Sequence, residues 1–169
     1  MGDQAIFLLV EDNPDHVLLL QRAFIKGKIM NPLQLVRSGE EAIEYLSGTG
    51  RFANRAEFPL PALVLLDLKM PGIDGFEVLR WIRRQPNIAT LRVVVLTTSD
   101  ETRDIDLAYK LGANSFLVKP TDFERFVQVS QALSGYWIWL DKAPTVSRLP
   151  ISAILGQELE KPRQDRPTP

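Results

Sequence analysis

The chain has 169 residues, of which 45% are hydrophobic and 24% charged, and its formal net charge is −1. This length fits one domain, and the hydrophobic content is sufficient for a packed core, which excludes disorder throughout the chain. The absence of cysteine excludes disulfides, thiolate nucleophiles and iron–sulfur clusters, and a single histidine excludes a multi-histidine metal site.

Segments typical of strands and helices alternate from the start of the chain. The hydrophobic run 5–10 is followed by acidic residues and suits a strand that is buried on both faces. A helix is predicted to begin at the cap residue Asn13, ahead of a proline, and to end near Gly27. A second strand is expected at 33–36, and Ser38 then has capping-box spacing to a glutamate and predicts the next helix.

The middle of the chain continues the same alternation. We expect the segment 48–59 to be a long connection outside the core, because it is rich in Gly, Arg and Asn. A third strand is predicted at 62–66, followed by a turn at 70–72 and a helix at 75–84, which a Gln-Pro pair ends. The hydrophobic run 92–96 predicts a fourth strand.

The last predicted elements lead into a proline-rich end. A rather polar helix is expected at about 100–111, a fifth strand at 115–118, and a final helix that opens at Thr121 with capping-box spacing. Five strands that each precede a helix predict a doubly wound α/β fold with a parallel sheet and right-handed crossovers. Residues 141–169 lose this pattern and are predicted to form a proline-rich C-terminal extension that is too short for a second domain.

Polar residues follow four of the five predicted strands: Glu11-Asp12, Asp67, Thr97 and Lys119. Ligands of open α/β sheets bind at the carboxyl ends of the strands, so these side chains are expected to meet at one edge. Three carboxylates repel one another unless a cation joins them, and an all-oxygen cluster favours Mg²⁺. A hydroxyl and an ammonium are donors that suit an anion, so the set is suited to phosphoryl transfer to a carboxylate nucleophile.

The alternative for each of these residues is a structural role. An acid at the end of a strand often only caps the next helix, and Asp12 could do no more than that. Capping does not explain the whole set, because Lys119 precedes a proline and caps nothing.

These motifs resemble the receiver domain of bacterial two-component response regulators. The matching segments are Val-Glu-Asp-Asn at 10–13, Leu-Leu-Asp-Leu-Lys-Met-Pro-Gly-Ile-Asp-Gly at 65–75, Val-Leu-Thr-Thr-Ser at 95–99 and Gly-Ala-Asn-Ser-Phe-Leu-Val-Lys-Pro at 112–120. The resemblance covers residues 5–140 and implies a flavodoxin-like five-stranded sheet.

The resemblance also implies roles for individual residues. Asp67 would be the phosphoacceptor that takes a phosphoryl group from a kinase phosphohistidine. Asp12 and Asp67 would be direct Mg²⁺ ligands, with Glu11 acting through water and the backbone carbonyl of Lys69 as a further ligand. The protein would catalyse its own phosphorylation and slow autodephosphorylation without being a turnover enzyme.

Further roles follow from the same resemblance. Thr97 and Lys119 would donate hydrogen bonds to the phosphoryl oxygens, and Phe116 would be the switch aromatic that turns inward when Thr97 moves. The bond between Lys119 and Pro120 would be cis, which only X–Pro bonds adopt at low cost.

The partners are expected to be proteins. The sequence is similar to stand-alone regulators that pair with phytochrome-type histidine kinases, so we expect no output domain and signalling by docking. We predict a homodimer through the face formed by the helix 100–111, the strand 115–118 and the helix after Thr121. Of Tyr136, Trp137 and Trp139 in that last helix, at least one should be exposed, because together they surround it.

Other partners and compartments are not favoured. The near-zero net charge argues against broad nucleic-acid binding, and no hydrophobic run reaches the ~20 residues of a membrane span. The first residues resemble no secretory leader, and we therefore expect a cytoplasmic protein.

The sequence is also compatible with other functions. A Mg²⁺-dependent phosphatase with an aspartate nucleophile would share the metal and the strand-end acid, but it would need a second acid where Lys69 stands. A flavin- or nucleotide-binding domain would need a Gly-rich loop after the first strand, and a pure scaffold would accept no phosphate.

His16 is interpreted as a solvated surface residue. Residues 149–159 would form either a short amphipathic helix or a frayed tail.

Overall fold

A five-stranded parallel sheet runs through residues 5–140, the part of the chain that the computed structural model describes. The strands lie in the order β2-β1-β3-β4-β5. Their bounds are Phe7–Val10 (β1), Leu33–Val36 (β2), Leu63–Leu66 (β3), Arg92–Thr97 (β4) and Ser115–Val118 (β5). The predicted doubly wound sheet is confirmed. The predicted C-terminal extension, with the tail segment 149–159, lies outside the described residues.

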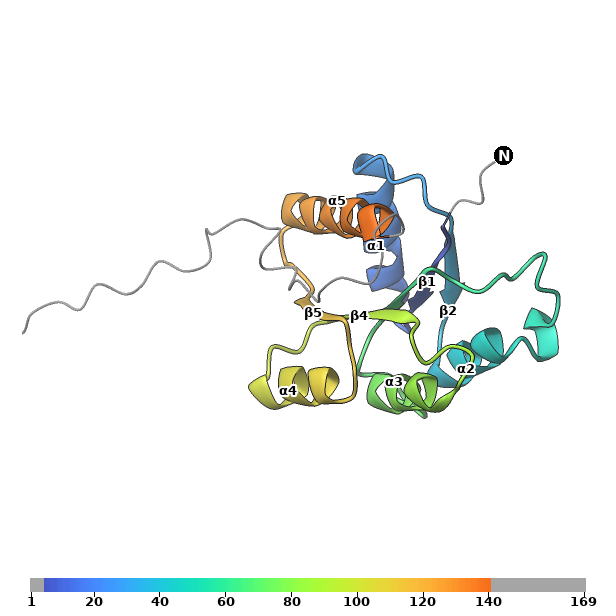
Figure 1. The fold of residues 1–169 in the computed structure, drawn as a ribbon. Coiled ribbons are helices and arrows are strands. Elements are labelled where there is room, and N and C mark those ends of the chain that lie inside the picture. Colours follow the sequence, from blue (N-terminus) through green and yellow to red (C-terminus); the bar gives the residue numbers. More distant parts are fainter. Residues whose placement is uncertain (1–4, 141–169) are drawn as a thin grey trace, which may run out of the picture.

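Helices cover both faces of the sheet (Figure 1). On one face lie α1 (Pro14–Lys26) and α5 (Phe123–Leu140). On the other face lie α2 (Gly39–Ser47), α3 (Gly75–Arg84) and α4 (Thr102–Lys110), and a short 3₁₀ helix, η1 (Gly50–Phe52), follows α2. Among the described residues, no helix has both the length and the hydrophobicity to cross a membrane.

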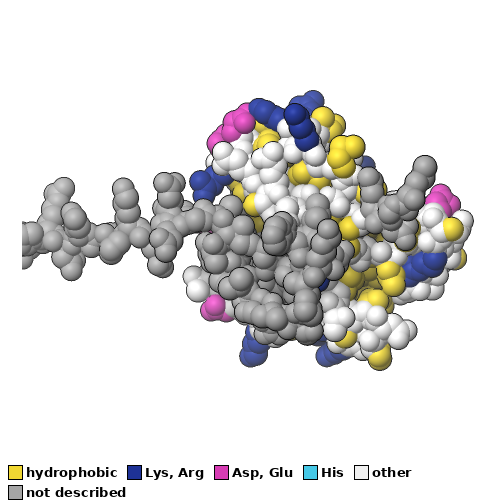
Figure 2. Space-filling model, turned by 45° about the horizontal axis from the view of Figure 1, so that its top comes forward, with side chains coloured by type: hydrophobic (Ala, Val, Ile, Leu, Met, Phe, Trp, Pro, Cys, Tyr) yellow, Lys and Arg dark blue, Asp and Glu magenta, His cyan; other side chains and the backbone are white. Residues whose placement is uncertain are grey.

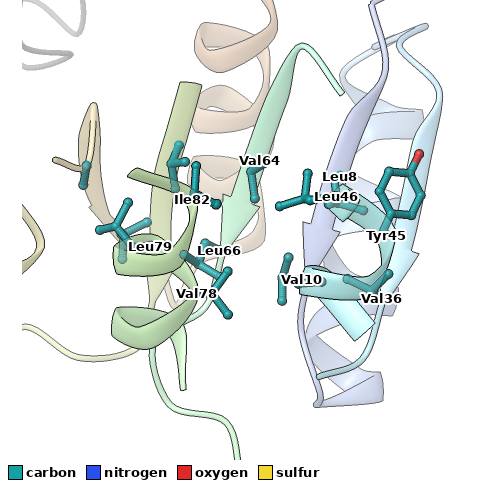
Figure 3. Packing of buried hydrophobic residues seen from close by; sticks show 14 of the residues in the cluster. Leu8, Val10, Val36, Tyr45, Leu46, Val64, Leu66, Val78, Leu79 and Ile82 are labelled. Atoms are coloured by element: carbon teal, nitrogen blue, oxygen red, sulfur yellow. The ribbon is translucent and has the colours of Figure 1, made fainter. Parts of the chain in front are cut away.

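The strands form the centre of two hydrophobic clusters because their side chains alternate between the faces. Phe7 and Leu9 of β1 pack with α1 and α5, whereas Leu8 and Val10 pack with α2 and α3. β1 and β3 are buried along their whole length, as expected of central strands in a parallel sheet. Figure 3 shows the second face, where the labelled side chains of β1, β2 and β3 point toward α2 and α3.

Side-chain caps begin α1, α2, α3 and α5, mostly where the sequence predicts them. The side chain of Asn13 accepts hydrogen bonds from the first turn of α1, and that of Ser38 accepts one from the first turn of α2. For α5 the predicted cap, Thr121, is wrong. Asp122 takes this position, because its carbonyl accepts the first helical hydrogen bond from Phe126 and its carboxylate accepts from the backbone N–H of Glu124 at 3.2 Å.

The connection 48–59 contributes to the core, contrary to the sequence prediction. Phe52 is buried, its ring centroid lies 5.1 Å from that of Tyr45, and the ring of Phe58 packs against both. Arg55 donates to the carbonyls of Tyr45 and Leu46, each at 2.8 Å, and so satisfies the end of α2. Burial raises the pKa of Tyr45, and the Arg55 guanidinium opposes this shift.

The register of the strands aligns their carboxyl ends. Val10 of β1 pairs with Leu66 of β3, and Leu66 pairs with Val95 of β4. Thr97 of β4 pairs with Val118 of β5. In the sheet, β2 lies on one side of β1 and β3 lies on the other, so the strand order reverses at β1. Ligands of such sheets bind where the order reverses, which is at the carboxyl ends of β1 and β3.

Gly75, the first residue of α3, packs directly on the end of β3. A Cβ atom at this position would lie 2.1 Å from the Asp67 carbonyl oxygen, and the backbone N–H of Gly75 donates to the Leu68 carbonyl at 2.9 Å. We expect Gly75→Ala to lower the free energy of unfolding by roughly 1–3 kcal/mol, the usual cost of overpacking. Urea unfolding followed by circular dichroism measures this change.

Gly135→Ala is the matched control, because a Cβ atom there meets nothing within 4 Å. It lies inside α5, where alanine favours the helix over glycine by about 1 kcal/mol. We expect Gly135→Ala to leave stability unchanged or to raise it. A Gly75→Ala variant as stable as the wild type would show that α3 moves away from β3 without cost.

Candidate functional site

Three carboxylates lie together at the carboxyl edge of the sheet. Glu11 and Asp12 follow β1, Asp67 follows β3, and one oxygen of each lies within 4.8 Å of the others. Glu11 and Asp67 are buried, and Asp12 is half-buried. The aligned register of β1 and β3 places these side chains at the same level.

Lys119 brings a positive charge to these acids from the end of β5. Its Nζ atom forms an ion pair with Glu11 Oε2 and lies 3.8 Å from Asp67 Oδ2. The side chain is only 9% exposed, and the backbone N–H of Lys119 donates to the Thr97 carbonyl at 2.7 Å. The expected cis bond to Pro120 is wrong: the described residues contain no cis peptide bond, and trans is the lower-energy form of an X–Pro bond.

Thr97 ends β4 at the same edge, and its side chain is fully buried. Its hydroxyl oxygen accepts a hydrogen bond from the backbone N–H of Ser99 at 3.4 Å. The hydroxyl is therefore linked to the loop that leads from β4 to α4.

Lys69, two residues after Asp67, turns its ammonium toward the first turn of α4. Its Nζ atom lies 3.8 Å from both Glu101 Oε1 and Asp104 Oδ2. Asp104 is buried and accepts a hydrogen bond from the Ser99 hydroxyl at 2.6 Å. The side chain of Lys69 thus connects the loop after β3 with α4.

Phe116 lies in β5, at the edge of the sheet. Its side chain is half-buried and packs against the hydrophobic cluster shared with α2, α3 and α4. Its backbone N–H donates to the hydroxyl of Tyr109 at 3.1 Å, which joins α4 to the edge strand.

His16 belongs to the site, although the sequence suggested a solvated surface residue. Its Nδ1 atom lies 3.0 Å from Lys119 Nζ and 3.5 Å from Glu11 Oε1, and its side chain is 33% exposed. The one sequence signal for this position is that His16 lies in the first turn of the helix that follows the acid pair. Its contact with Lys119 could not be predicted from local patterns, because 103 residues separate the two.

The charges of the site favour a divalent cation and a phosphoryl group. Three carboxylates face one ammonium, so the pocket keeps an excess of negative charge that a bound cation would balance. The all-oxygen set fits hard cations such as Mg²⁺ or Mn²⁺. Asp67 has one oxygen, Oδ1, bonded to the Leu68 N–H at 2.9 Å, while Oδ2 faces Lys119, which suits a nucleophile beside a donor.

Comparisons with known proteins agree with this chemistry. The model of the response regulator receiver domain matches residues 7–131. Among curated proteins, the probable methanogenesis regulatory protein FilR2 of Methanothrix harundinacea is 39% identical over 145 residues, which are 84% of this chain and 89% of FilR2. Response regulator Rcp1 of Synechocystis is 34% identical over 133 residues, 79% of this chain and 88% of Rcp1.

Solved structures show the same relationship. The phosphorylated cyanobacterial phytochrome response regulator RcpA is 33% identical, with a TM-score of 0.75, and the match covers 84% of this chain and 99% of RcpA. The Mn²⁺-bound form of Rcp1 is 32% identical, with a TM-score of 0.71, and the match covers 85% and 99% of the two chains.

Fold, site and relatives lead to one assignment and leave the phosphatase alternative without support. The chain belongs to the response regulator receiver domain family and acts in two-component phosphorelay signalling.

Proposed function

We propose that Asp67 accepts a phosphoryl group from the phosphohistidine of a histidine kinase and that the modified protein signals by docking. The observation that carries this proposal is the position of Asp67 Oδ2, 3.8 Å from the Lys119 ammonium and next to Glu11 and Asp12. A carboxylate in this place has a donor for the incoming group beside it and lies next to acids that could hold a metal.

The transfer is a displacement at phosphorus. An Asp67 oxygen forms a bond to phosphorus while the bond between phosphorus and the donor's imidazole nitrogen breaks, and that nitrogen keeps the electron pair. Lys119 and Thr97 donate to the phosphoryl oxygens, where negative charge develops. Water later attacks the same phosphorus, the bond between phosphorus and the Asp67 oxygen breaks, and inorganic phosphate leaves, so the protein slowly removes its own modification.

A magnesium ion would be held by Asp12 and Asp67 directly, by Glu11 through water and by the Lys69 carbonyl. When bound, it balances the carboxylates and neutralises charge on the transferring group. The carboxylate cluster supports this assignment, and the Mn²⁺-bound form of the similar Rcp1 is consistent with it.

The signal would pass to the face of α4, β5 and α5. The phosphoryl group would draw in the Thr97 hydroxyl, which is linked through Ser99 to the start of α4, and the Phe116 ring would fill the space that Thr97 leaves. Exposed hydrophobic side chains on this face, Tyr109 and Val118, support homodimerisation there. The side chains of Tyr136, Trp137 and Trp139 lie outside the described residues.

The kinase partner would be of the phytochrome type, since the similar RcpA is a phytochrome response regulator. Such a donor makes its phosphohistidine from ATP, which places the exchange in the cytoplasm. Nucleic acid is not an expected partner. On the face seen in Figure 2, Lys and Arg side chains are mixed with acidic and hydrophobic ones among the described residues, not gathered into one basic area.

The phosphoacceptor assignment predicts one modified residue. Incubation with Mg²⁺ and acetyl phosphate should add a single phosphoryl group by intact mass, and Asp67→Asn should abolish it, because an amide is a poor nucleophile. Asp106→Asn, which alters an exposed acid on α4, should be phosphorylated like the wild type. Steady phosphate release from diverse phosphomonoesters would instead indicate a phosphatase, and modification of Asp67→Asn would reject the assignment.

The dimer assignment predicts a localised sensitivity. Tyr109→Asp should raise the dissociation constant of the dimer at least tenfold, because it places a charge on the exposed side of α4 next to β5 that would be buried between copies. Sedimentation equilibrium, with and without phosphorylation, measures it. Ile25→Asp on α1 is the matched control, since Ile25 is an exposed hydrophobic residue in the other helix layer. Only monomer at high micromolar wild-type concentration would contradict the proposal.

A further inference from the structure

Three acceptors surround the ammonium of Lys119. Two are the carboxylates of Glu11 and Asp67, and the third is the Nδ1 atom of His16, at 3.0 Å. Glu11 and His16 lie at hydrogen-bond distance from the ammonium, whereas Asp67, at 3.8 Å, is an ion-pair partner. The other two belong to the site already described, whereas the role of His16 is open.

The distances decide which tautomer His16 adopts. Nδ1 faces an ammonium, and two donors pointing at each other at 3.0 Å would repel, so Nδ1 accepts and the proton lies on Nε2. The longer contact of the same atom with Glu11 Oε1, at 3.5 Å, does not require a second proton. That carboxylate already receives hydrogen bonds from Lys119 at Oε2 and from the Asn13 N–H at Oε1.

A neutral acceptor has a specific advantage in this pocket. Another carboxylate would add to the negative charge that three acids already create and would compete with the phosphoryl group for the Lys119 ammonium. The imidazole of His16 directs one N–H without that charge. The start of α1 fixes the backbone of His16, because Asn13 caps this turn by accepting from the backbone N–H of Asp15 and of His16.

We propose that His16 is a positioning residue for phosphoryl transfer: its imidazole accepts a hydrogen bond from Lys119 through Nδ1 and keeps the ammonium beside Asp67. This inference rests on the proposed role of Asp67 as phosphoacceptor. Lys119 turns its other N–H groups from the carboxylates to the phosphoryl oxygens during transfer and keeps the one that His16 accepts.

The first test uses the fact that the chain has a single histidine. In the full-length protein labelled with ¹⁵N-histidine, long-range ¹H–¹⁵N NMR spectra report which ring nitrogen carries the proton. We expect unprotonated Nδ1 and protonated Nε2 at neutral pH, and we expect Lys119→Met to shift the ring toward a mixture of tautomers. A proton on Nδ1 in the wild type, or no response to Lys119→Met, would overturn the proposal.

The second test measures phosphorylation by acetyl phosphate in the presence of Mg²⁺. His16→Leu should lower the second-order rate constant about tenfold, the factor that corresponds to about 1.4 kcal/mol, while the dissociation constant of Mg²⁺ stays unchanged. His16→Asn should recover most of the rate, because the Asn Oδ1 atom takes the place of Nδ1 as an acceptor. Gln21→Leu adds a leucine at an exposed position of α1 and should behave like the wild type.

The outcomes separate this inference from the function on which it rests. Equal rates for the wild type and His16→Leu would reject it, as would equal losses in His16→Leu and His16→Asn, since the acceptor would then not matter. Failure of the wild type itself to take up phosphate would reject the proposed function. In that case the NMR experiment would still decide whether His16 accepts from Lys119.

Discussion

The contact between the Lys119 ammonium and the buried carboxylates of Glu11 and Asp67 is the interaction on which the site depends. Without a cation, these acids would repel one another, and the repulsion is stronger where water is excluded. Lys119 reaches them because Val118, the last residue of β5, pairs with Thr97 at the end of the sheet, so the residue after the strand lies at the edge where the acids lie. The register that builds the hydrophobic core therefore also builds the charged pocket.

The balance of charge explains why this pocket is suited to phosphoryl acceptance. One ammonium does not neutralise three carboxylates, so a phosphate-bearing donor meets repulsion until a divalent cation is present. Lys69 occupies the position where an aspartate phosphatase would need a second acid, and its ammonium pairs with Glu101 and Asp104. The other acids of the described site, Glu11 and Asp12, belong to the carboxylate cluster with Asp67 and, as proposed, would hold the metal.

Patterns with a short range in sequence predicted most of the fold and the main acids of the site. Hydrophobic runs identified the strands, and the residues after them identified the edge where Asp67 and Lys119 meet. Features that depend on distant contacts were missed. His16 contacts Lys119, which is distant in sequence. Phe52 is buried because its ring packs against Tyr45 of α2, although the segment around Phe52 is polar. The cap of α5 lies one residue later than predicted. Thr121 and Asp122 both have a side-chain acceptor, and local spacing alone does not distinguish between them.

The contact of Gly75 with the end of β3 makes the two sides of the pocket differ in stiffness. On the α3 side, backbone meets backbone: the Asp67 carbonyl leaves no space for a side chain at position 75, and the Gly75 N–H is bonded to Leu68. On the α4 side, the described connections run through side chains: Asp104 contacts Lys69 of the loop after β3 and Ser99 of the loop after β4, and Tyr109 accepts from the backbone of Phe116 in β5. Side chains rotate far more readily than a packed main chain shifts. If Asp67 accepts a phosphoryl group as proposed, we therefore expect the α4 side of the pocket to shift more readily than the α3 side.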